Sequence, residues 1–325
     1  MQSLLDPAIL FFVFGLAAGA VRSNLEIPAP ISRFLSLYLL MALGLKGGFA
    51  LAHSGLNREV SASLLSALLL AVIVPALAYA LLRRRLNGFD AAAVAATYGS
   101  VSAVTFITAT QHLESIGLAF GGHMAAAMAL MESPAIVMAV LLVNRVRQQQ
   151  TQQPGSSAAG SNTRLGHLLH ESFTDGAQLL LLGAMLIGLI TGEAGKTVMQ
   201  PFAGDLFKGM LSFFLLDMGL LAARNLGQLR GQSPLLLAYA LGAPLVHAGL
   251  ALALGAAMEL GTGNTALLMV LAASASYIAV PAVLRQAVPE AQPALYFGMS
   301  LGLTFPFNIL LGIPLYTQVA RAVLG

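Results

Sequence analysis

Long apolar segments, separated mostly by short polar connections, recur along the whole chain. A helix that spans a bilayer needs about 20 residues, and a segment in hydrocarbon must pair its backbone groups internally, so each segment is expected to be helical. The expected helices are Leu4–Val21, Phe34–Ala52, Ser61–Leu82, Asp90–Gln111, Gly122–Val143, Gly176–Ile190, Leu206–Ala223, Pro234–Met258, Asn264–Leu284 and Pro293–Tyr316. The pattern predicts an all-α integral membrane protein with ten transmembrane helices.

The composition supports this class. Of the 325 residues, 58% are hydrophobic and 9% are charged, whereas a soluble domain has about 45–50% apolar and about 25% charged residues. These values argue against a soluble enzyme and a nucleic-acid-binding protein. The chain has no cysteine, which excludes a disulfide scaffold. Asp6 and Pro7 stand where a cleavable signal peptide carries basic residues, so we expect the first helix to be retained.

The two sets of five segments resemble each other in sequence. Similar stretches occur in the same order: Tyr38–Leu45 with Phe213–Leu220, Pro75 with Pro244, Gly99–Ser102 with Ala273–Ser276, and Glu132–Pro134 with Thr304–Pro306. Because five is an odd number, the second set must enter the membrane from the opposite side, and such inverted repeats are typical of secondary transporters. We expect a first repeat over 1–148, a polar linker over 149–172 and a second repeat over 173–325. The alternative is low complexity shared by Leu-, Ala- and Gly-rich helices.

The basic residues predict the orientation. Loops on one side hold Arg22, Arg33, Arg83, Arg84, Arg85, Arg145, Arg147, Arg164, Arg224, Arg230 and Arg285, whereas the side of the N-terminus holds Lys46, Arg58, Lys196, Lys208 and Arg321. The excess of basic residues marks the cytoplasmic side. We therefore expect both termini outside and the linker 149–172 in the cytoplasm. The linker is rich in Gln, Ser and Gly and is expected to be a tether, with a docking or modification site as the alternative.

Two serine pairs near the middle of the fourth and ninth segments are the candidate substrate site. Glycine permits a helix break, serine hydroxyls both donate and accept hydrogen bonds, and Pro281 favours a break in the ninth segment. The ends of broken helices can hold an oxyanion or a dehydrated cation. The alternative is that these small residues serve helix packing. The candidate residues are Gly99, Ser100, Val101, Ser102, Ser274, Ala275 and Ser276.

Polar residues within the other segments are candidate ligands for a coupling ion. A carboxylate at membrane depth is costly and indicates function, and Na⁺ prefers oxygen ligands as other hard cations do. The candidates are Thr105, Thr108, Glu132, Ser133, Thr304 and Asn308, together with Asp217, which could instead pair with a neighbouring helix or lie nearer the interface. The six histidines show no metal-binding spacing, so we expect Na⁺ alone and no cofactor.

Several of these motifs resemble one known family. The stretches Tyr98–Phe106, Met131–Pro134 and Thr304–Asn308, with the length and the five-plus-five arrangement, resemble the cyanobacterial sodium-dependent bicarbonate transporter family. The resemblance covers essentially the whole chain apart from the linker. The motifs in the fourth and fifth segments are fairly specific, whereas the remainder is typical of apolar helices in general.

The resemblance implies a plasma-membrane Na⁺/bicarbonate symporter that concentrates inorganic carbon. It further implies a homotrimer, a core domain that moves against a gate domain in an elevator-like cycle, and a small trimeric PII-like regulator that binds the cytoplasmic face. By position, the family's bicarbonate site falls on the two serine breaks, and its sodium ligands are expected among Thr105, Glu132 and Asn308.

Other functions fit the sequence less well. A sodium symporter for organic anions, such as a bile-acid-like carrier, is the nearest alternative and would need a wider cavity. A sodium/proton antiporter would be expected to carry an aspartate pair in the broken helices, which is absent from the sequence. An intramembrane hydrolase would require Ser100 or Ser274 to pair with His123 or His247, and no motif supports this, so we do not expect an enzyme.

Overall fold

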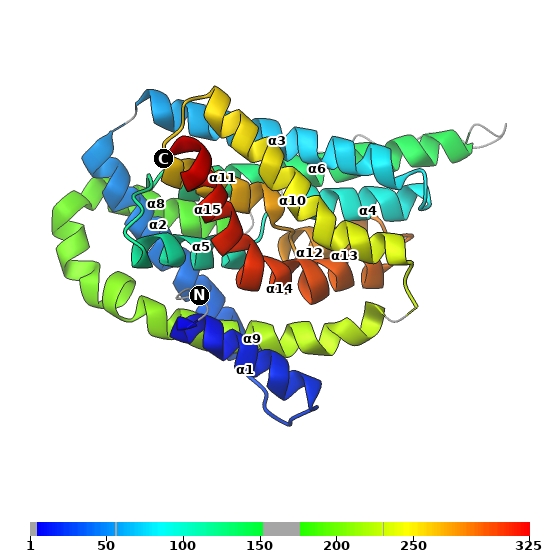
Figure 1. The fold of residues 1–325 in the computed structure, drawn as a ribbon, viewed down its shortest axis with the longest axis horizontal. Coiled ribbons are helices and arrows are strands. Elements are labelled where there is room, and N and C mark those ends of the chain that lie inside the picture. The colour runs from blue at the N-terminus through cyan, green and yellow to red at the C-terminus, as the bar shows by residue number, and fades with distance from the viewer. Residues whose placement is uncertain (1–4, 56, 152–175, 230) are drawn as a thin grey trace.

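The computed structural model describes residues 5–55, 57–151, 176–229 and 231–325, and the regular structure in these ranges is helical throughout. The helices of the first half are α1 (Pro7–Ala20), α2 (Ala29–Ser54), α3 (Arg58–Leu82), α4 (Gly88–Gly99), α5 (Ala103–Ser115) and α6 (Met124–Thr151). In Figure 1, α1 and α9 lie together at one edge of the bundle, and α3 and α6 lie at the opposite edge.

The second half is helical in the same way but contains π-helical and 3₁₀ turns. Its helices are α8 (Gly176–Met199), η2 (Gln200–Asp205), α9 (Phe207–Leu226), η3 (Gly227–Leu229), α10 (Pro234–Ala257), α11 (Thr262–Ala273), α12 (Ala279–Ala287), α13 (Pro293–Met299), η4 (Ser300–Thr304), α14 (Phe305–Phe307), η5 (Asn308–Gly312) and α15 (Ile313–Leu324). The π-helical turns η4 and η5 flank Pro306, and such turns are frequent at functional sites.

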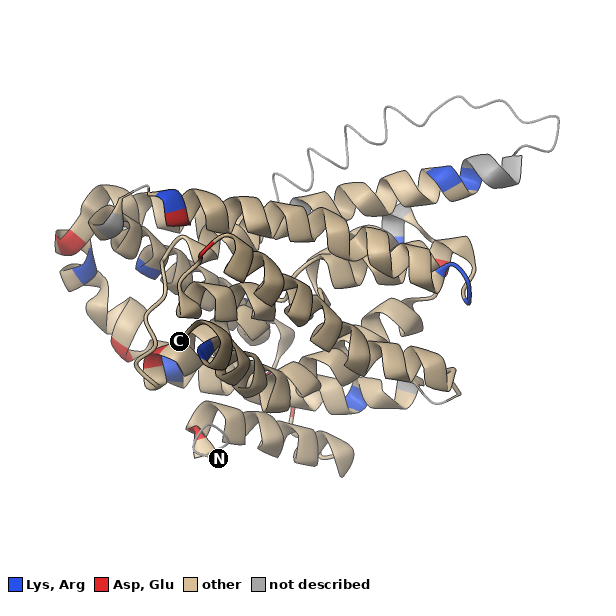
Figure 2. Ribbon diagram, turned by 45° about the horizontal axis from the view of Figure 1, so that its top comes forward, with Lys and Arg blue, Asp and Glu red and all other residues tan. Residues whose placement is uncertain are grey.

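The structure is that of a multi-pass membrane protein. Within the described ranges, seven helical stretches are long and apolar enough to cross a membrane. One of them, Gly176–Leu226, contains α8, η2 and α9 and therefore both the sixth and seventh expected helices. The first expected helix corresponds to the shorter apolar helix Pro7–Ala20, and the first half of the ninth corresponds to Thr262–Ala273. The all-helical membrane class is confirmed, whereas the number of ten spans stays a prediction. Charged residues lie mainly near helix ends (Figure 2).

Two helix pairs pack with their backbones in close contact. In the pair of α1 with α9, a Cβ added at Gly15 would lie 2.3 Å from the carbonyl oxygen of Leu216. In the pair of α2 with α8, a Cβ added at Gly48 would lie 2.1 Å from the carbonyl oxygen of Met185. Glycine is thus required at both contacts, as is common where membrane helices approach closely.

Helices α4 and α11 are the most enclosed elements of the fold. Every residue from Asp90 to Gly99 and from Gly263 to Ala273 is buried. Both helices consist largely of alanine and other small or aliphatic residues, and a helix that is apolar all round is expected in the interior. They carry the two serine breaks at their C-terminal ends, so the candidate site lies deep within the protein.

Part of the predicted linker falls outside the described residues. Residues 149–151 continue α6, which ends at Thr151, and the rest of the 149–172 linker is outside the described ranges. Arg164 and Arg230 of the orientation argument also lie outside those ranges.

Candidate functional site

The fourth expected helix is broken after Gly99. Helix α4 ends there because Ser100 adopts an extended backbone (φ −92°, ψ −178°), and α5 begins at Ala103. The Ser102 hydroxyl oxygen caps α5 by accepting a hydrogen bond from the Thr105 amide over 3.2 Å. A serine here satisfies an amide that the first turn of a helix leaves without a backbone partner. The break predicted from the sequence is present in the structure.

The ninth expected helix is broken in the same manner. Ser274 ends α11 with an extended backbone (φ −79°, ψ 166°), and α12 begins at Ala279. The Ser276 hydroxyl oxygen accepts a hydrogen bond from the Val280 amide over 3.2 Å. Pro281 lies in the first turn of α12, where the missing amide of a proline interrupts no helical hydrogen bond.

The two breaks bind each other directly. The Ser102 amide donates a hydrogen bond to Ser274 Oγ over 3.0 Å, and the Ser276 amide donates one to the Thr97 carbonyl oxygen over 2.9 Å. Ser102 of the first break thus contacts the C-terminal end of α11, and Ser276 of the second break contacts the C-terminal end of α4. Residues more than 170 positions apart therefore form one crossing, and all four of these residues are buried.

A cavity of about 270 Å³, here called the small cavity, lies beside this crossing. It is lined by residues 101–104 of the first break and by residues 276–279 of the second, together with residues of α2, α6 and α8. These are the residues at the N-terminal ends of α5 and α12, where the helix dipole is positive. No lysine or arginine is present among the described residues that line it.

The predicted bicarbonate residues divide into two groups. Val101, Ser102 and Ser276 line the small cavity. The other four, Gly99, Ser100, Ser274 and Ala275, are buried at the crossing and do not line the cavity. Gly99 is held against α3, because an added Cβ would lie 2.6 Å from Pro75 Cβ.

Glu132 is the one predicted sodium ligand that lines the small cavity in the described structure. Its Oε2 accepts a hydrogen bond from Gln178 Nε2 over 2.7 Å. Because Glu132 lies on α6 and Gln178 lies on α8, this bond joins two of the helices that line the cavity. Glu132 is therefore the acidic side chain of a cavity that is otherwise lined by apolar groups, hydroxyls, the Gln178 amide and helix N-termini.

Thr304 and Asn308 lie together on the far side of the crossing. Thr304 Oγ1 donates a hydrogen bond to the Ala240 carbonyl oxygen over 2.7 Å and lies 2.6 Å from the Tyr98 hydroxyl. Asn308 Nδ2 donates to the Ala273 carbonyl oxygen, at the C-terminal end of α11, over 2.8 Å. Asn308 thus contacts a helix end of negative dipole, whereas Thr304 contacts the interior of α10, and neither residue lines the small cavity with Glu132.

Three buried hydroxyls near the first break have no hydrogen-bond partner within the described structure. They are Thr97 Oγ1, Ser100 Oγ and Thr105 Oγ1. Buried hydroxyls normally have a partner, and hydroxyl oxygens are suitable ligands for a hard cation. The sodium-ligand role of Thr105 stays a prediction. Thr108 donates instead to the Val104 carbonyl oxygen over 2.8 Å, and the side chain of Ser133 lies outside the described structure.

Asp217 is buried on α9 with 4% of its surface exposed. It forms a side-chain hydrogen bond with Ser32 of α2, and its Oδ2 has no partner in the described structure. It also interacts electrostatically with Tyr277, which follows Ser276 in the second break. Asp217 does not line the small cavity, so both the sodium role and the helix-partner role predicted for it stay open.

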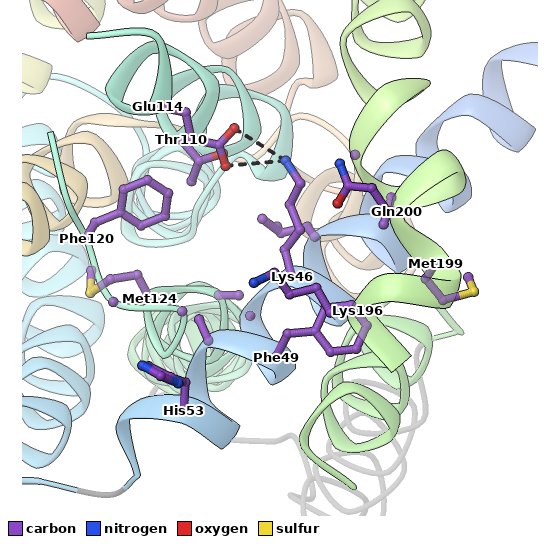
Figure 3. Close-up of a pocket in the computed structure, with 18 of the residues that line it drawn as sticks. Lys46, Phe49, His53, Thr110, Glu114, Phe120, Met124, Lys196, Met199 and Gln200 are labelled. Carbon is purple, nitrogen blue, oxygen red and sulfur yellow. Dashed lines mark hydrogen bonds and ion pairs between the residues drawn. The ribbon is translucent and has the colours of Figure 1, made fainter. Parts of the chain in front are cut away.

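A larger cavity, of about 710 Å³, lies along the same helices and is here called the large cavity. It is lined by charged residues from three of them, namely Lys46 of α2, Glu114 of α5, and Glu193 and Lys196 of α8. Figure 3 shows Lys46 reaching Glu114, with 3.3 Å between Nζ and Oε1. The basic and acidic side chains are paired, so this cavity has no excess charge among these four residues.

The sequence did not single out three residues that line the small cavity. Gln178 is the partner of Glu132, and Ser36 of α2 and Tyr277 of the second break add hydroxyl groups. A glutamine in the sixth apolar segment was a usable signal, because a polar amide is unusual there. Ser36 carried no such signal, because it lies in a segment of mixed polarity near the start of its helix.

Comparison with known proteins identifies the family. A family model described as the Na⁺-dependent bicarbonate transporter superfamily matches residues 7–321, which is nearly the whole chain. No curated protein matches the chain. The match includes both serine breaks, both cavities and every residue proposed above as a ligand.

Proposed function

This chain belongs to the Na⁺-dependent bicarbonate transporter superfamily, and we propose that it is a symporter that carries bicarbonate with Na⁺ and holds the anion in the small cavity. The observation that carries the proposal is the pair of helix N-termini at residues 102–104 and 277–279, which line one cavity of about 270 Å³. Positive helix ends and backbone amides favour an anion. Membership in a transporter family also favours transport over enzymatic activity.

The chemistry of the small cavity suits a small and weakly held anion. Serine hydroxyls and helix ends bind an oxyanion without the strong attraction of a lysine or arginine, so release is possible. Cavities for drug-sized ligands measure about 300–1,000 Å³, and the small cavity, at about 270 Å³, lies below this range. Its size favours bicarbonate over a bile-acid-like anion.

Sodium coupling follows from the energetics of the anion. The entry of one bicarbonate ion into a negative-inside cell costs about 2.3 kcal/mol of electrical free energy per 100 mV. One Na⁺ that moves with the anion cancels this cost. Glu132 beside the small cavity, and the buried hydroxyl of Thr105, support a sodium site on this side of the crossing. Asn308, at the carbonyl end of α11, supports a second cation site outside the small cavity.

The inverted repeat over 1–148 and 173–325 is supported by matching hydrogen bonds. Asp90 Oδ1, in the third position of α4, accepts from the Gln292 amide just before α13 over 2.7 Å. Asn264 Oδ1, in the third position of α11, accepts from the Gly121 amide shortly before α6 over 2.7 Å. Each half thus supplies an acceptor to the start of the last segment of the other half, as an inverted repeat requires.

An elevator-like cycle is supported by the position of the small cavity. Helices α1, α2, α8 and α9 are here called the gate unit, and α5, α6 and α12 are assigned to the core unit. The cavity lies between α2 and α8 of the gate unit and, from the core unit, the N-terminal ends of α5 and α12 and the interior of α6. The gate unit is held together by the two glycine-lined helix pairs. A site between two such units can change its access when one unit moves against the other.

The proposal also includes the orientation in the membrane, the oligomeric state and a regulatory partner. The arginine distribution supports termini outside and a cytoplasmic 149–172 linker in the plasma membrane. The homotrimer and the PII-like regulator on the cytoplasmic face are supported by the family resemblance alone.

Uptake of labelled bicarbonate into proteoliposomes tests the function. At alkaline pH, where bicarbonate predominates over dissolved carbon dioxide, we expect uptake with an inward Na⁺ gradient and little uptake with K⁺ in its place. Empty liposomes under the same gradients provide the background. Uptake that is indifferent to Na⁺ would refute the coupling, and labelled bile acid carried in preference to bicarbonate would favour the alternative carrier.

A further inference from the structure

The small and large cavities lie one beyond the other along the same helices. Three helices each contribute to both cavities within a single turn. The small cavity is lined by Leu40 of α2, Val104 of α5 and Met128 of α6. The large cavity is lined by Leu43, Phe106 and Ala125 of the same helices. The fourth helix, α8, lines the small cavity at residues 177–181 and the large cavity at residues 193–199. The two cavities therefore lie on one path through the protein.

The partition between the cavities is thin at α2, α5 and α6. An α-helix rises 1.5 Å per residue, so a step of two or three residues corresponds to about 3–4.5 Å along the helix axis. This distance is enough for one layer of side chains. It is not enough for a second layer, so the separation of the cavities depends on a small number of residues.

This layer is apolar and closed. Leu43, Phe106 and Met128 belong to one hydrophobic cluster and are 5%, 1% and 3% exposed. Phe106 is one of the largest fully buried side chains of the protein. Hydrophobic constrictions exclude ions because water leaves them, and an unpaired charge in apolar surroundings is strongly disfavoured.

We propose that Phe106 is the central plug of a single-layer barrier between the two cavities, completed by Leu43 and Met128. The barrier forces bicarbonate to cross only when α5 and α6 move relative to α2. This inference rests on the proposed function, because it takes the small cavity as the anion site. Phe106 itself contacts no ion, and its role is to block the path.

Replacing the plug tests this role through an uncoupled flux. In Phe106→Ala proteoliposomes, we expect bicarbonate uptake without Na⁺ to rise several-fold above that of the wild type. Ile107→Ala is the matched control, because Ile107 is 2% exposed, follows Phe106 on α5 and lines neither cavity. Phe106→Leu, a smaller change, serves if the alanine variant does not elute as a single folded species. Equal Na⁺-independent uptake in the Phe106 and Ile107 variants would overturn the proposal.

Thiol labelling tests the barrier without any transport measurement. The chain contains no cysteine, so Ser36→Cys places a single thiol in the small cavity and Lys196→Cys places one in the large cavity. A membrane-impermeant methanethiosulfonate reagent is added to intact cells. We expect Lys196→Cys to react whether Phe106 is present or replaced by alanine, and Ser36→Cys to react only in the Phe106→Ala background.

The two tests separate the inference from the function on which it rests. Wild-type uptake that is independent of Na⁺ contradicts the proposed coupling. The barrier is then tested by the labelling result alone. The barrier itself is contradicted if Ser36→Cys is labelled while Phe106 is present. It is also contradicted if Ser36→Cys stays unlabelled in the Phe106→Ala background while Lys196→Cys reacts.

Discussion

The Ser102 amide donates a hydrogen bond to Ser274 Oγ over 3.0 Å, so a residue of the first helix break is held by a residue of the second. Ser274 Oγ in turn donates to the Leu271 carbonyl oxygen over 2.8 Å, which fixes the hydroxyl in the position of an acceptor. The N-terminal end of α5 is thereby oriented by the C-terminal end of α11. Any movement of one broken helix would be transmitted to the other through this contact.

Ser274→Ala should raise the bicarbonate concentration needed for half-maximal uptake. The substitution removes the acceptor of the Ser102 amide, and an unsatisfied buried amide costs about 1–3 kcal/mol, so α5 would lose its fixed orientation. Bicarbonate-dependence curves at saturating Na⁺ measure the effect. Ser115→Ala is the control, because this exposed serine lies on α5 at its far end. Identical curves for Ser274→Ala and wild type would contradict the role of this contact.

Ser102→Ala and Ser276→Ala should abolish transport while leaving the protein folded. Both serines cap helices that point into the small cavity, and loss of a serine cap costs about 1 kcal/mol, which is too little to unfold a stable domain. Uptake and the melting temperature in detergent are measured on the same preparations. Wild-type uptake in both variants would assign these serines to helix packing instead.

Glu132→Gln should weaken the dependence on Na⁺. The variant keeps a side chain of the same size beside Gln178 but removes the negative charge that faces the small cavity. We expect the Na⁺ concentration for half-maximal uptake to rise, with the bicarbonate dependence at saturating Na⁺ less affected. Gln178→Ala removes the partner and keeps the charge, so it separates loss of the hydrogen bond from loss of the carboxylate. An unchanged Na⁺ dependence in Glu132→Gln would exclude Glu132 as a ligand.

The features that sequence reasoning predicted correctly depend on local chemistry. The two helix breaks follow from the conformations that Gly99, the serines and Pro281 favour, and capping by Ser102 involves residues three positions apart. The features that it missed depend on contacts between distant segments. Gln178 reaches Glu132 across 46 positions, and the cavities form between helices whose relative placement no local pattern encodes. For the same reason, the sequence could not show that Asn308 does not line the small cavity with Glu132.

Gly48→Ala should destabilise the gate unit, whereas Gly183→Ala should not. An added Cβ at Gly48 would lie 2.1 Å from the Met185 carbonyl oxygen, whereas one at Gly183 on the same helix pair meets no atom within 4 Å. Overpacking of this kind costs about 1–3 kcal/mol. Melting temperatures of the two variants in detergent provide the comparison. Equal melting temperatures would show that α2 and α8 separate without cost.

Substitutions at Asp90 should produce a graded loss of stability that tests the paired arrangement of the two halves. Asp90 Oδ1 accepts from the Gln292 amide, and its Oδ2 accepts from Asn87 Nδ2 over 2.6 Å. Asp90→Asn can keep the first bond but must lose the second, because it places an amide donor opposite another donor. Asp90→Ala loses both bonds, and each buried group left unsatisfied costs about 1–3 kcal/mol.

The same reasoning applies to Asn264 in the second half. Asn264→Ala leaves the Gly121 amide without its acceptor and Glu59 without the Nδ2 donor, so its loss of stability should match that of Asp90→Ala. We expect the melting temperature to fall from wild type through Asp90→Asn to the two alanine variants. If Asn264→Ala were neutral while Asp90→Ala destabilised the protein, the two bonds would not be equivalent, and the strongest structural support for an inverted repeat would be lost.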